Sequence, residues 1–305
     1  MNKTKIFLGL FLLILLAFAA LIGLRWSQAS REVAYEWDNF DAYPPALATT
    51  SRLEIIPLYE ADSISPDFIS GHGVSYLIRT DSATILLDVG DNPDGLAVAP
   101  FAQNMQNLGI DWGEVDRVVI SHPHPDHVGG LPAWRERAIS FGELPGGLGK
   151  RLVFVPHVST YKGAVHATVP TLPAPDIATT GVISYLESWP MTMFAAKGGE
   201  QALVVHVAGQ GLVLITGCGH PSLERLVTRA ESLYSAPVVG VVGGLHYLNA
   251  TADEIQPQIV FLQSRQPKLV ALSPHDSGSD ALSAFKNAFP SAYSTLKIGE
   301  SILFP

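Results

Sequence analysis

The sequence contains one cysteine, few charged residues and no internal repeat. Cys218 has no second cysteine to pair with, so an internal disulfide is excluded, and one thiol gives no information on the redox compartment. Charged residues make up only 15% of the 305 residues and hydrophobic residues 47%, so the chain can bury a substantial core. Without repeats or long polar low-complexity tracts, one compact domain is the simplest organisation for most of the chain.

Basic residues are also scarce. Lysine and arginine number 19 against 28 aspartate and glutamate residues, which gives a formal net charge of −9. Lys3, Lys5 and Arg25 lie in the first 30 residues, where there is no acidic residue, so the remainder is still more acidic. Because an acidic surface repels the phosphate backbone of nucleic acids, we expect no nucleic acid partner.

The first 30 residues contain the one long hydrophobic run. Residues 6–24 are uncharged, and at about 1.5 Å per residue they would span roughly 29 Å, enough to cross a bilayer. Ser27-Gln28-Ala29 is also a small-x-small cleavage site, so residues 1–30 are either an uncleaved membrane anchor, which we favour, or a signal peptide. In both cases the basic flank stays in the cytoplasm, and the rest is expected on the extracytoplasmic, periplasmic side.

The remaining chain divides into an expected tether and one domain. Residues 31–52 are polar and contain Pro44-Pro45, which is typical of a tether, and the domain is expected to cover residues 53–305. Short apolar runs predict strands at 53–59, 74–78, 84–88, 115–120, 152–155, 202–207, 212–215, 238–242 and 268–272. Periodic apolar positions predict helices at 94–108, 131–138, 221–233 and 253–265. Residues 157–181 lack periodicity and are expected to form a lid or binding wall.

The densest group of metal-binding residue types lies at residues 121–130, directly after an apolar strand. It contains His122, His124, Asp126 and His127. Imidazole and carboxylate are ligands that divalent metals such as zinc accept. A loop bending around one point can direct His122 and His124 at one ion, and Asp126 and His127 at a second. Two ions held close together can activate one bridging water.

The pattern His-x-His-x-Asp-His after an apolar strand resembles the signature of the metallo-β-lactamase superfamily. The resemblance implies a mixed α/β fold, a four-layer αββα sandwich with a dinuclear metal site at one edge, here preceded by the N-terminal hydrophobic helix. It also implies that further metal ligands follow downstream. In this family an Asp-x-Gly such as Asp88-Val89-Gly90 supports the metal loop by accepting hydrogen bonds.

Histidines follow three more predicted strands, at positions 220, 246 and 275. Many superfamily members carry Thr-Gly-Asp at the first of these strand ends, where the aspartate bridges both ions, but Cys218 stands at that position here. Because a lone cysteine in an apolar strand end is most often inert core, we expect His220 to be the ligand and leave open whether Cys218 contacts metal. His275 is the expected last ligand.

Six short motifs together resemble one branch of the superfamily, the dihydropterin-ribofuranosylaminobenzene-phosphate synthase-like metallo-hydrolases. The motifs are Gly-His-Gly-Val-Ser, His-x-His-x-Asp-His, Glu-Gln-Ala-Leu, Thr-Gly-Cys-Gly-His, Gly-Gly-Leu-His and Pro-His-x-Ser-Gly. They cover roughly residues 53 to 300. His72, in the first motif, is expected to be structural rather than a ligand. Because such folds host many reactions, the branch leaves the substrate open.

The expected activity is that of a metal-dependent hydrolase with two divalent ions, of which Zn²⁺ is favoured over Mn²⁺ and Fe²⁺. The first ion would be held by His122, His124 and His220, and the second by Asp126, His127 and His275. A hydroxide bridging the ions would attack a carbonyl or phosphoryl centre of a small-molecule substrate. Asp126 would orient the hydroxide, and His246 would bind substrate or protonate the leaving group. The alternatives are a mononuclear iron oxygenase or redox protein on the same fold, and a non-catalytic metal-binding sensor.

Overall fold

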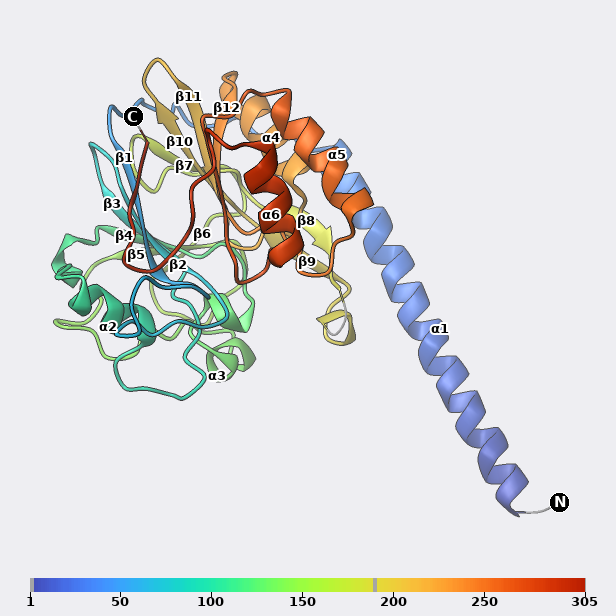
Figure 1. Cartoon of the computed structure of the whole chain (residues 1–305). Coiled ribbons are helices and arrows are strands. Elements are labelled where there is room, and N and C mark those ends of the chain that lie inside the picture. The colour runs from blue at the N-terminus through green and yellow to red at the C-terminus, as the bar shows by residue number, and fades with distance from the viewer. Residues whose placement is uncertain (1–2, 189–190, 305) are drawn as a thin grey trace. The chain divides into compact units, whose positions relative to one another are not determined.

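Figure 1 shows a computed structural model of the chain, which describes residues 3–188 and 191–304. The chain divides into two compact units. One contains residues 1–41 and 184–199, and the other contains residues 42–183 and 200–305.

The first unit is built around the helix α1 (Lys3–Asp38). It is the one helix among the described residues that is long and apolar enough to cross a membrane, and a signal sequence has the same properties. The helix does not stop at residue 30. Because no glycine or proline occurs between Gly23 and Pro44, it continues to Asp38, and the start of the expected tether is helical.

A hairpin belongs largely to the same unit. It consists of β8 (Ile183–Leu186) and β9 (Lys197–Glu200), with the short helix η3 (Met191–Met193) before β9. Lys197 Nζ lies 2.6 Å from Glu36 Oε1 of α1. This ion pair joins the hairpin to the polar end of the helix.

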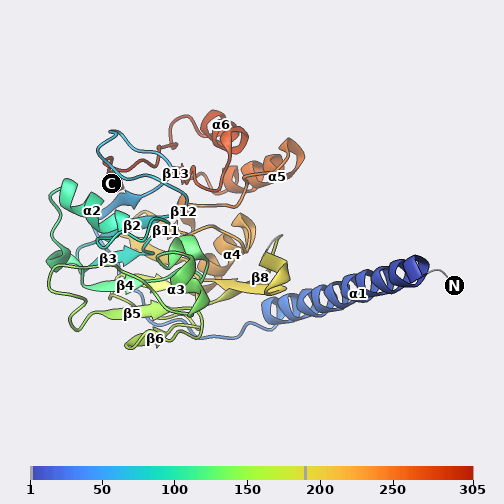
Figure 2. The ribbon, with the colours of Figure 1, turned by 90° about the horizontal axis from the view of Figure 1, so that it is seen from below.

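The larger unit contains a seven-stranded sheet in the order β14-β1-β2-β3-β4-β5-β6. Its strands are β1 (Leu53–Tyr59), β2 (Ser75–Arg79), β3 (Thr84–Leu87), β4 (Arg117–Val119), β5 (Leu152–Val155), β6 (Ala164–His166) and β14 (Ile302–Phe304). Strands β3 to β6 pair in parallel and the others antiparallel. Figure 2 shows β2 to β6 in succession.

A second sheet has five strands in the order β13-β12-β11-β10-β7. They are β7 (Ile177–Thr179), β10 (Leu203–Val207), β11 (Gly211–Ile215), β12 (Val238–Gly243) and β13 (Leu269–Leu272). Strands β11, β12 and β13 run parallel. Their carboxyl ends therefore reach the same edge of the sheet.

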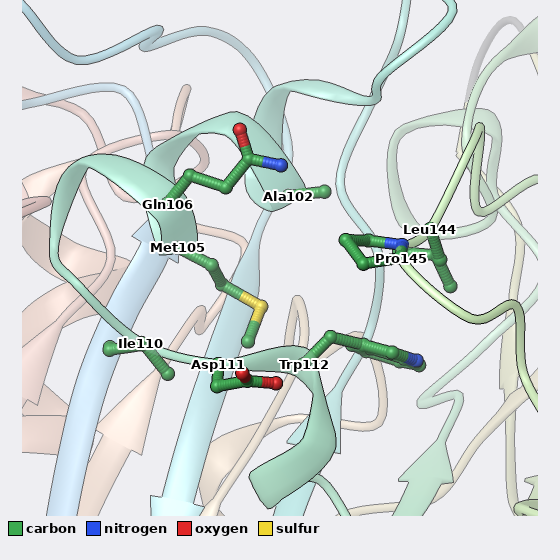
Figure 3. A pocket seen from close by; sticks show the side chains of 8 residues that line it. All are labelled: Ala102, Met105, Gln106, Ile110, Asp111, Trp112, Leu144 and Pro145. Carbon is green, nitrogen blue, oxygen red and sulfur yellow. The ribbon is translucent and has the colours of Figure 1, made fainter.

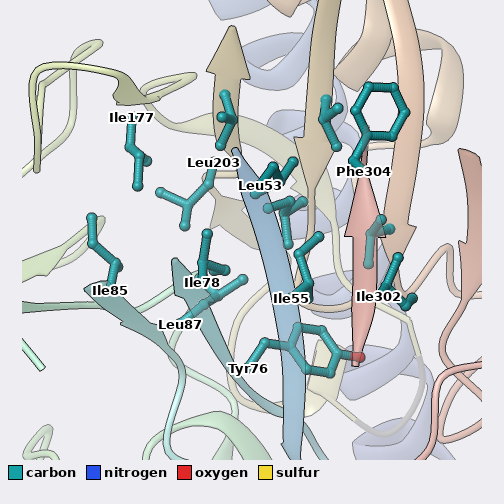
Figure 4. Close-up of a cluster of buried hydrophobic side chains, with 14 of the residues drawn as sticks. Leu53, Ile55, Tyr76, Ile78, Ile85, Leu87, Ile177, Leu203, Ile302 and Phe304 are labelled. Atoms are coloured by element: carbon teal, nitrogen blue, oxygen red, sulfur yellow. The ribbon is translucent and has the colours of Figure 1, made fainter. Parts of the chain in front are cut away.

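The two sheets face each other across one hydrophobic core (Figure 4). Alternate side chains such as Ile55 and Leu87 from the first sheet meet Leu203 and Val205 from the second, and all are fully buried. Burying one such side chain contributes roughly 1.5–3 kcal/mol. Side chains at every second position of these strands therefore point inward, and their packing holds the two sheets together.

Helices cover the outer faces of both sheets. They are α2 (Pro100–Asn107), α3 (Leu131–Arg135), α4 (Leu223–Tyr234), α5 (Ala252–Gln263) and α6 (Ser279–Ala288). The first two pack with the outer face of the seven-stranded sheet, and Figure 1 shows the other three beyond the five-stranded sheet. The fold is therefore the expected four-layer αββα sandwich, and the long apolar helix precedes it.

Several local expectations were wrong. Residues 157–181 contain β6 and β7, whose three-residue lengths are too short to show alternation in the sequence. The helix expected from residue 94 begins only at Pro100, because proline's fixed φ favours the first helical turn. The hairpin β8–β9, the helix α6 and the edge strand β14 were not expected.

Candidate metal centre

Loops that follow parallel strands of both sheets meet at one rim. They leave the ends of β3, β4, β11, β12 and β13. The loops after β4, β11 and β13 bring together the six residues expected to hold metal, which are His122, His124, Asp126, His127, His220 and His275. Their convergence follows from strand direction, because parallel strands deliver their carboxyl ends to one edge.

Three imidazoles form the first group of candidate ligands. His122 Nε2 lies 3.1 Å from His124 Nδ1 and 3.2 Å from His220 Nε2. Ring nitrogens at this separation repel one another unless a proton or a cation lies between them. The group is therefore suited to a cation.

The second group consists of Asp126, His127, Cys218 and His275. Asp126 Oδ2 lies 3.7 Å from His127 Nε2 and 4.0 Å from His275 Nε2. Cys218 Sγ lies 3.0 Å from His127 Nε2 and 3.3 Å from His275 Nε2. All four ligand atoms lie within 4.8 Å of one another, close enough to surround one ion.

Cys218 belongs to both groups. Its Sγ and one ring nitrogen each of His122 and His220 also lie within 4.8 Å of one another. The cysteine is buried, as expected for a core residue, but its sulfur contacts imidazole nitrogens. The structure therefore brings Cys218 and His220 to the site together.

Asp88 determines which nitrogen of two imidazoles carries the proton. Its Oδ2 accepts a hydrogen bond from Ser121 Oγ at 2.6 Å and another from His127 Nδ1 at 2.7 Å. Because the Ser121 hydroxyl donates to Asp88, its oxygen accepts from His122 Nδ1 at 2.8 Å. When neutral, as metal binding requires, both rings therefore direct the lone pair of Nε2 into the groups.

Glu60 and Ser273 determine in the same way which nitrogen of His275 carries the proton. Ser273 Oγ donates to Glu60 Oε2 at 2.6 Å and accepts from His275 Nδ1 at 2.6 Å. Glu60 also accepts from Tyr76 Oη at 2.7 Å and from the backbone N–H of His275 at 3.1 Å. Burial raises the pKa of Glu60 to about 7, although these donors oppose the rise. The relay leaves His275 Nε2 free of its proton.

A third buried carboxylate holds the loop that carries Cys218. Glu200 Oε1 accepts from the backbone N–H groups of Cys218 at 3.1 Å and Gly219 at 2.9 Å, and Oε2 accepts from that of His220 at 2.8 Å. Sequence reasoning assigned no role to Glu60, Ser273 or Glu200. The detectable signal for Glu200 is an acidic residue directly before a buried apolar strand.

Burial lowers the pKa of three imidazoles, those of His122, His220 and His275, well below the usual range. Neighbouring imidazoles lower the pKa further. Burial also disfavours charge on His127, but Asp126 and Asp88 outweigh it and raise its pKa to about 9. Burial, reinforced by nearby carboxylates, raises the pKa of the Cys218 thiol well above its usual range. A bound divalent cation would offset these carboxylates and favour the thiolate. The mixed nitrogen, sulfur and oxygen donor set fits a borderline metal such as zinc.

Two further histidines border the groups on their exposed side. The ring of His246 lies 4.3 Å from that of His220, and its backbone N–H donates to Asp276 Oδ2 at 3.1 Å. The backbone of His246 has φ 55°, an uncommon conformation that this hydrogen bond helps to hold. His72, which was expected to be structural, has its Nε2 3.4 Å from Asp126 Oδ2 and an exposed side chain. Both imidazoles therefore lie beside candidate ligands and are exposed.

Two histidines of the 157–181 segment contact each other. His166 Nδ1 is 3.1 Å from the backbone oxygen of His157. A cavity of about 160 Å³ is lined by residues of α2, the 3-10 helix η1 (Trp112–Glu114) and neighbouring loops, among them Met105, Trp112 and Leu144 (Figure 3). None of the candidate ligands lines this cavity.

Known proteins resemble the chain in sequence and in fold. The sequence model of the metallo-beta-lactamase superfamily matches residues 70–139, which include the histidine-rich loop. The chain is 24% identical over 284 residues to 7,8-dihydropterin-6-methyl-4-(beta-D-ribofuranosyl)-aminobenzene-5'-phosphate synthase of Methanocaldococcus jannaschii, covering 78% of this chain and 91% of that protein.

Two solved structures share the fold. Tm1679, a metal-dependent hydrolase of the beta-lactamase superfamily, superposes with a TM-score of 0.60 at 22% identity, covering 82% of this chain and 98% of that one. The metallo-beta-lactamase fold protein YhfI from Bacillus subtilis gives a TM-score of 0.52 at 12% identity, covering 83% and 100%. The matched motif and the αββα architecture make this chain similar to members of the metallo-beta-lactamase superfamily.

Proposed function

We propose that the chain is a hydrolase that uses two divalent metal ions, zinc foremost, to cleave a small-molecule substrate. The observation that carries the proposal is the convergence of imidazole lone pairs, the Asp126 carboxylate and the Cys218 sulfur in two adjacent groups. One ion would be held by His122, His124 and His220, and the other by Asp126, His127 and His275. Cys218, whose sulfur belongs to both groups, would be a further candidate ligand for either ion.

Bound ions would supply Lewis-acid chemistry, making a water molecule more acidic and offsetting the negative charge that develops on a carbonyl or phosphoryl oxygen. The chain's own residues would orient the reactants. The Asp126 carboxylate would accept a hydrogen bond from the attacking water. His246, exposed beside His220, would donate a proton to the leaving group, and the hydrogen bond from its N–H to Asp276 would hold it there.

Metal analysis of the purified full-length chain tests this function. About two zinc ions per chain, together with hydrolysis of simple ester or phosphodiester substrates, is the expected result. One iron per chain with oxygen consumption would contradict it and indicate the oxygenase alternative. Stably bound metal without turnover of any such substrate would indicate a sensor.

We propose that α1 is an uncleaved membrane anchor. The segment Ser27-Gln28-Ala29, where a signal peptidase would cut, lies inside the helix, whereas a protease needs an extended substrate. Ala29 is also buried, with an exposed fraction of 5%. We expect the full-length chain to stay in the membrane fraction through an alkaline carbonate wash, with residues N-terminal to Arg31 intact by mass spectrometry. Recovery of a soluble chain beginning near Ser30 would contradict the anchor.

Replacing Ser273 by alanine tests the relay that orients His275. Ser273→Ala should weaken metal binding at the second position by about 10–100-fold, the usual cost of losing an outer hydrogen-bond partner of a ligand. The measurement is metal retained during titration with a chelator. Ser232→Ala, which removes a hydroxyl from α4 that only donates to the Arg229 backbone oxygen, is the matched control. Identical retention in both variants would show that the relay does not support the ligand.

A further inference from the structure

The hairpin between β8 and β9 lies along α1, and its contacts with the helix occur in a regular order. Ser184 Oγ and Lys197 Nζ, both next to the strand ends, bind the carboxylate of Glu36. Lys197 also lies 3.2 Å from Glu32, one turn closer to the N-terminus. Arg25 Nη2 donates to the backbone oxygen of Phe194, beyond the tip helix η3, at 3.5 Å. From its strands to its tip, the hairpin therefore runs back along α1 from Glu36 to Arg25.

Arg25 defines the depth of the tip relative to the apolar run. It is the first charged residue after residues 6–24, which would occupy the hydrocarbon core of a bilayer. From Arg25 to Glu36 the helix rises by about 16 Å. Glu36 would thus lie well above the membrane, whereas Arg25 and the Phe194 backbone beside it would lie in the headgroup region.

The side chains at this level are apolar and exposed. Met193 is 48% exposed and Phe194 62% exposed, although large apolar side chains are normally buried in a folded domain. Trp26, on α1 next to Arg25, is 48% exposed, and tryptophan is the residue type that concentrates at membrane–water interfaces. The two segments therefore present apolar side chains at the depth where lipid headgroups meet acyl chains.

We propose that Met193 and Phe194 of the hairpin tip insert into the lipid interface beside α1 and form a second membrane contact. The inference rests on the proposed anchoring of α1. A lipid bilayer is the partner that the observations favour. The contact between Phe194 and Arg25 places the tip at the end of the membrane-spanning run. Two contacts at one depth would stop the polar end of α1 from rotating freely over the membrane.

Fluorescence of single-site labels in the full-length chain tests the proposal. An environment-sensitive fluorophore is attached in turn to Phe194→Cys, Leu16→Cys and Val260→Cys, in vesicles of phosphatidylcholine that is partly brominated along its acyl chains. Leu16 lies within the apolar run, and Val260 is an exposed apolar residue of α5, 56% exposed, which serves as the matched control. The unmodified chain gives the background, because Cys218 is buried. Circular dichroism checks that each variant folds as the unmodified chain does.

The label at position 194 should be quenched by brominated lipid several-fold more than the label at position 260, and less by aqueous iodide. If positions 194 and 260 respond equally to iodide while position 16 is quenched by lipid, the hairpin proposal fails and the anchor stands. If position 16 also escapes lipid quenching, the anchor fails with it. If position 194 is shielded from iodide and from lipid alike, protein covers the tip and the proposal is overturned.

Discussion

Cys218→Ser is expected to lower metal binding at both positions, because the Cys218 sulfur lies against imidazoles of both groups. A serine hydroxyl does not deprotonate near neutral pH and is a poor ligand for zinc, whereas a thiolate is a strong one. Losing a metal ligand costs at least as much as losing a hydrogen-bond partner of a ligand. The affinity for metal should therefore fall by about 100-fold or more. Metal content after dialysis against a chelator measures the loss, and activity should fall with it.

A spectroscopic readout distinguishes a ligand from a packing residue. In the cobalt-substituted chain, a thiolate ligand gives a sulfur-to-metal charge-transfer band in the near ultraviolet, and this band should disappear in Cys218→Ser. His157→Ala is the control, because His157 contacts His166 and is no candidate ligand. If Cys218→Ser keeps two metals and the unmodified chain lacks the band, while His220→Ala loses metal, the thiol is core packing and His220 alone is the ligand.

His275→Ala and His246→Ala are expected to fail in different ways, although both residues follow neighbouring parallel strands. Loss of His275 removes an imidazole whose Nε2 lies 3.3 Å from Cys218 Sγ, so metal content should fall toward one ion per chain. Loss of His246 should leave two ions bound. Turnover should nonetheless fall by roughly 10²–10⁴-fold, the usual contribution of a general acid.

The leaving group tests the role given to His246. With a nitrophenolate, which departs without a proton, the loss in His246→Ala should shrink, whereas the loss in His275→Ala should remain. Equal metal loss in both variants would make His246 a ligand. Full activity of His246→Ala with a poor leaving group would show that it has no catalytic part.

The layered fold could be predicted through the family resemblance of the histidine-rich motif, and the meeting of the ligand loops from short-range patterns. Apolar runs define the strands, and a histidine directly after a run marks a strand end at the rim. The buried carboxylate of Asp88 was expected from the family resemblance, but that of Glu60 could not be found from these patterns. Glu60 is far from Ser273 and His275 in the sequence, and only the packing of the two sheets brings it to them.

The imidazole contacts of Cys218 and the position of the hairpin tip could not be predicted from the sequence, for different reasons. The rule that a lone cysteine packs in the core describes its burial correctly, but it takes no account of neighbours supplied by other strands. The β8–β9 hairpin pairs with α1 through Lys197, Glu32 and Glu36, which look like ordinary surface charges in the sequence. Such residues acquire a role only from the tertiary structure.

The shared carboxylate of Asp88 makes the two proposed metal positions thermodynamically linked. The same Oδ2 atom orients His127 directly and His122 through Ser121, so it supports one imidazole of each group. An ion that orders this network at one position has already immobilised part of the other, which lowers the conformational entropy still to be lost there. Binding at one position would then favour binding at the other, and the singly loaded form would be less populated than two independent positions would give.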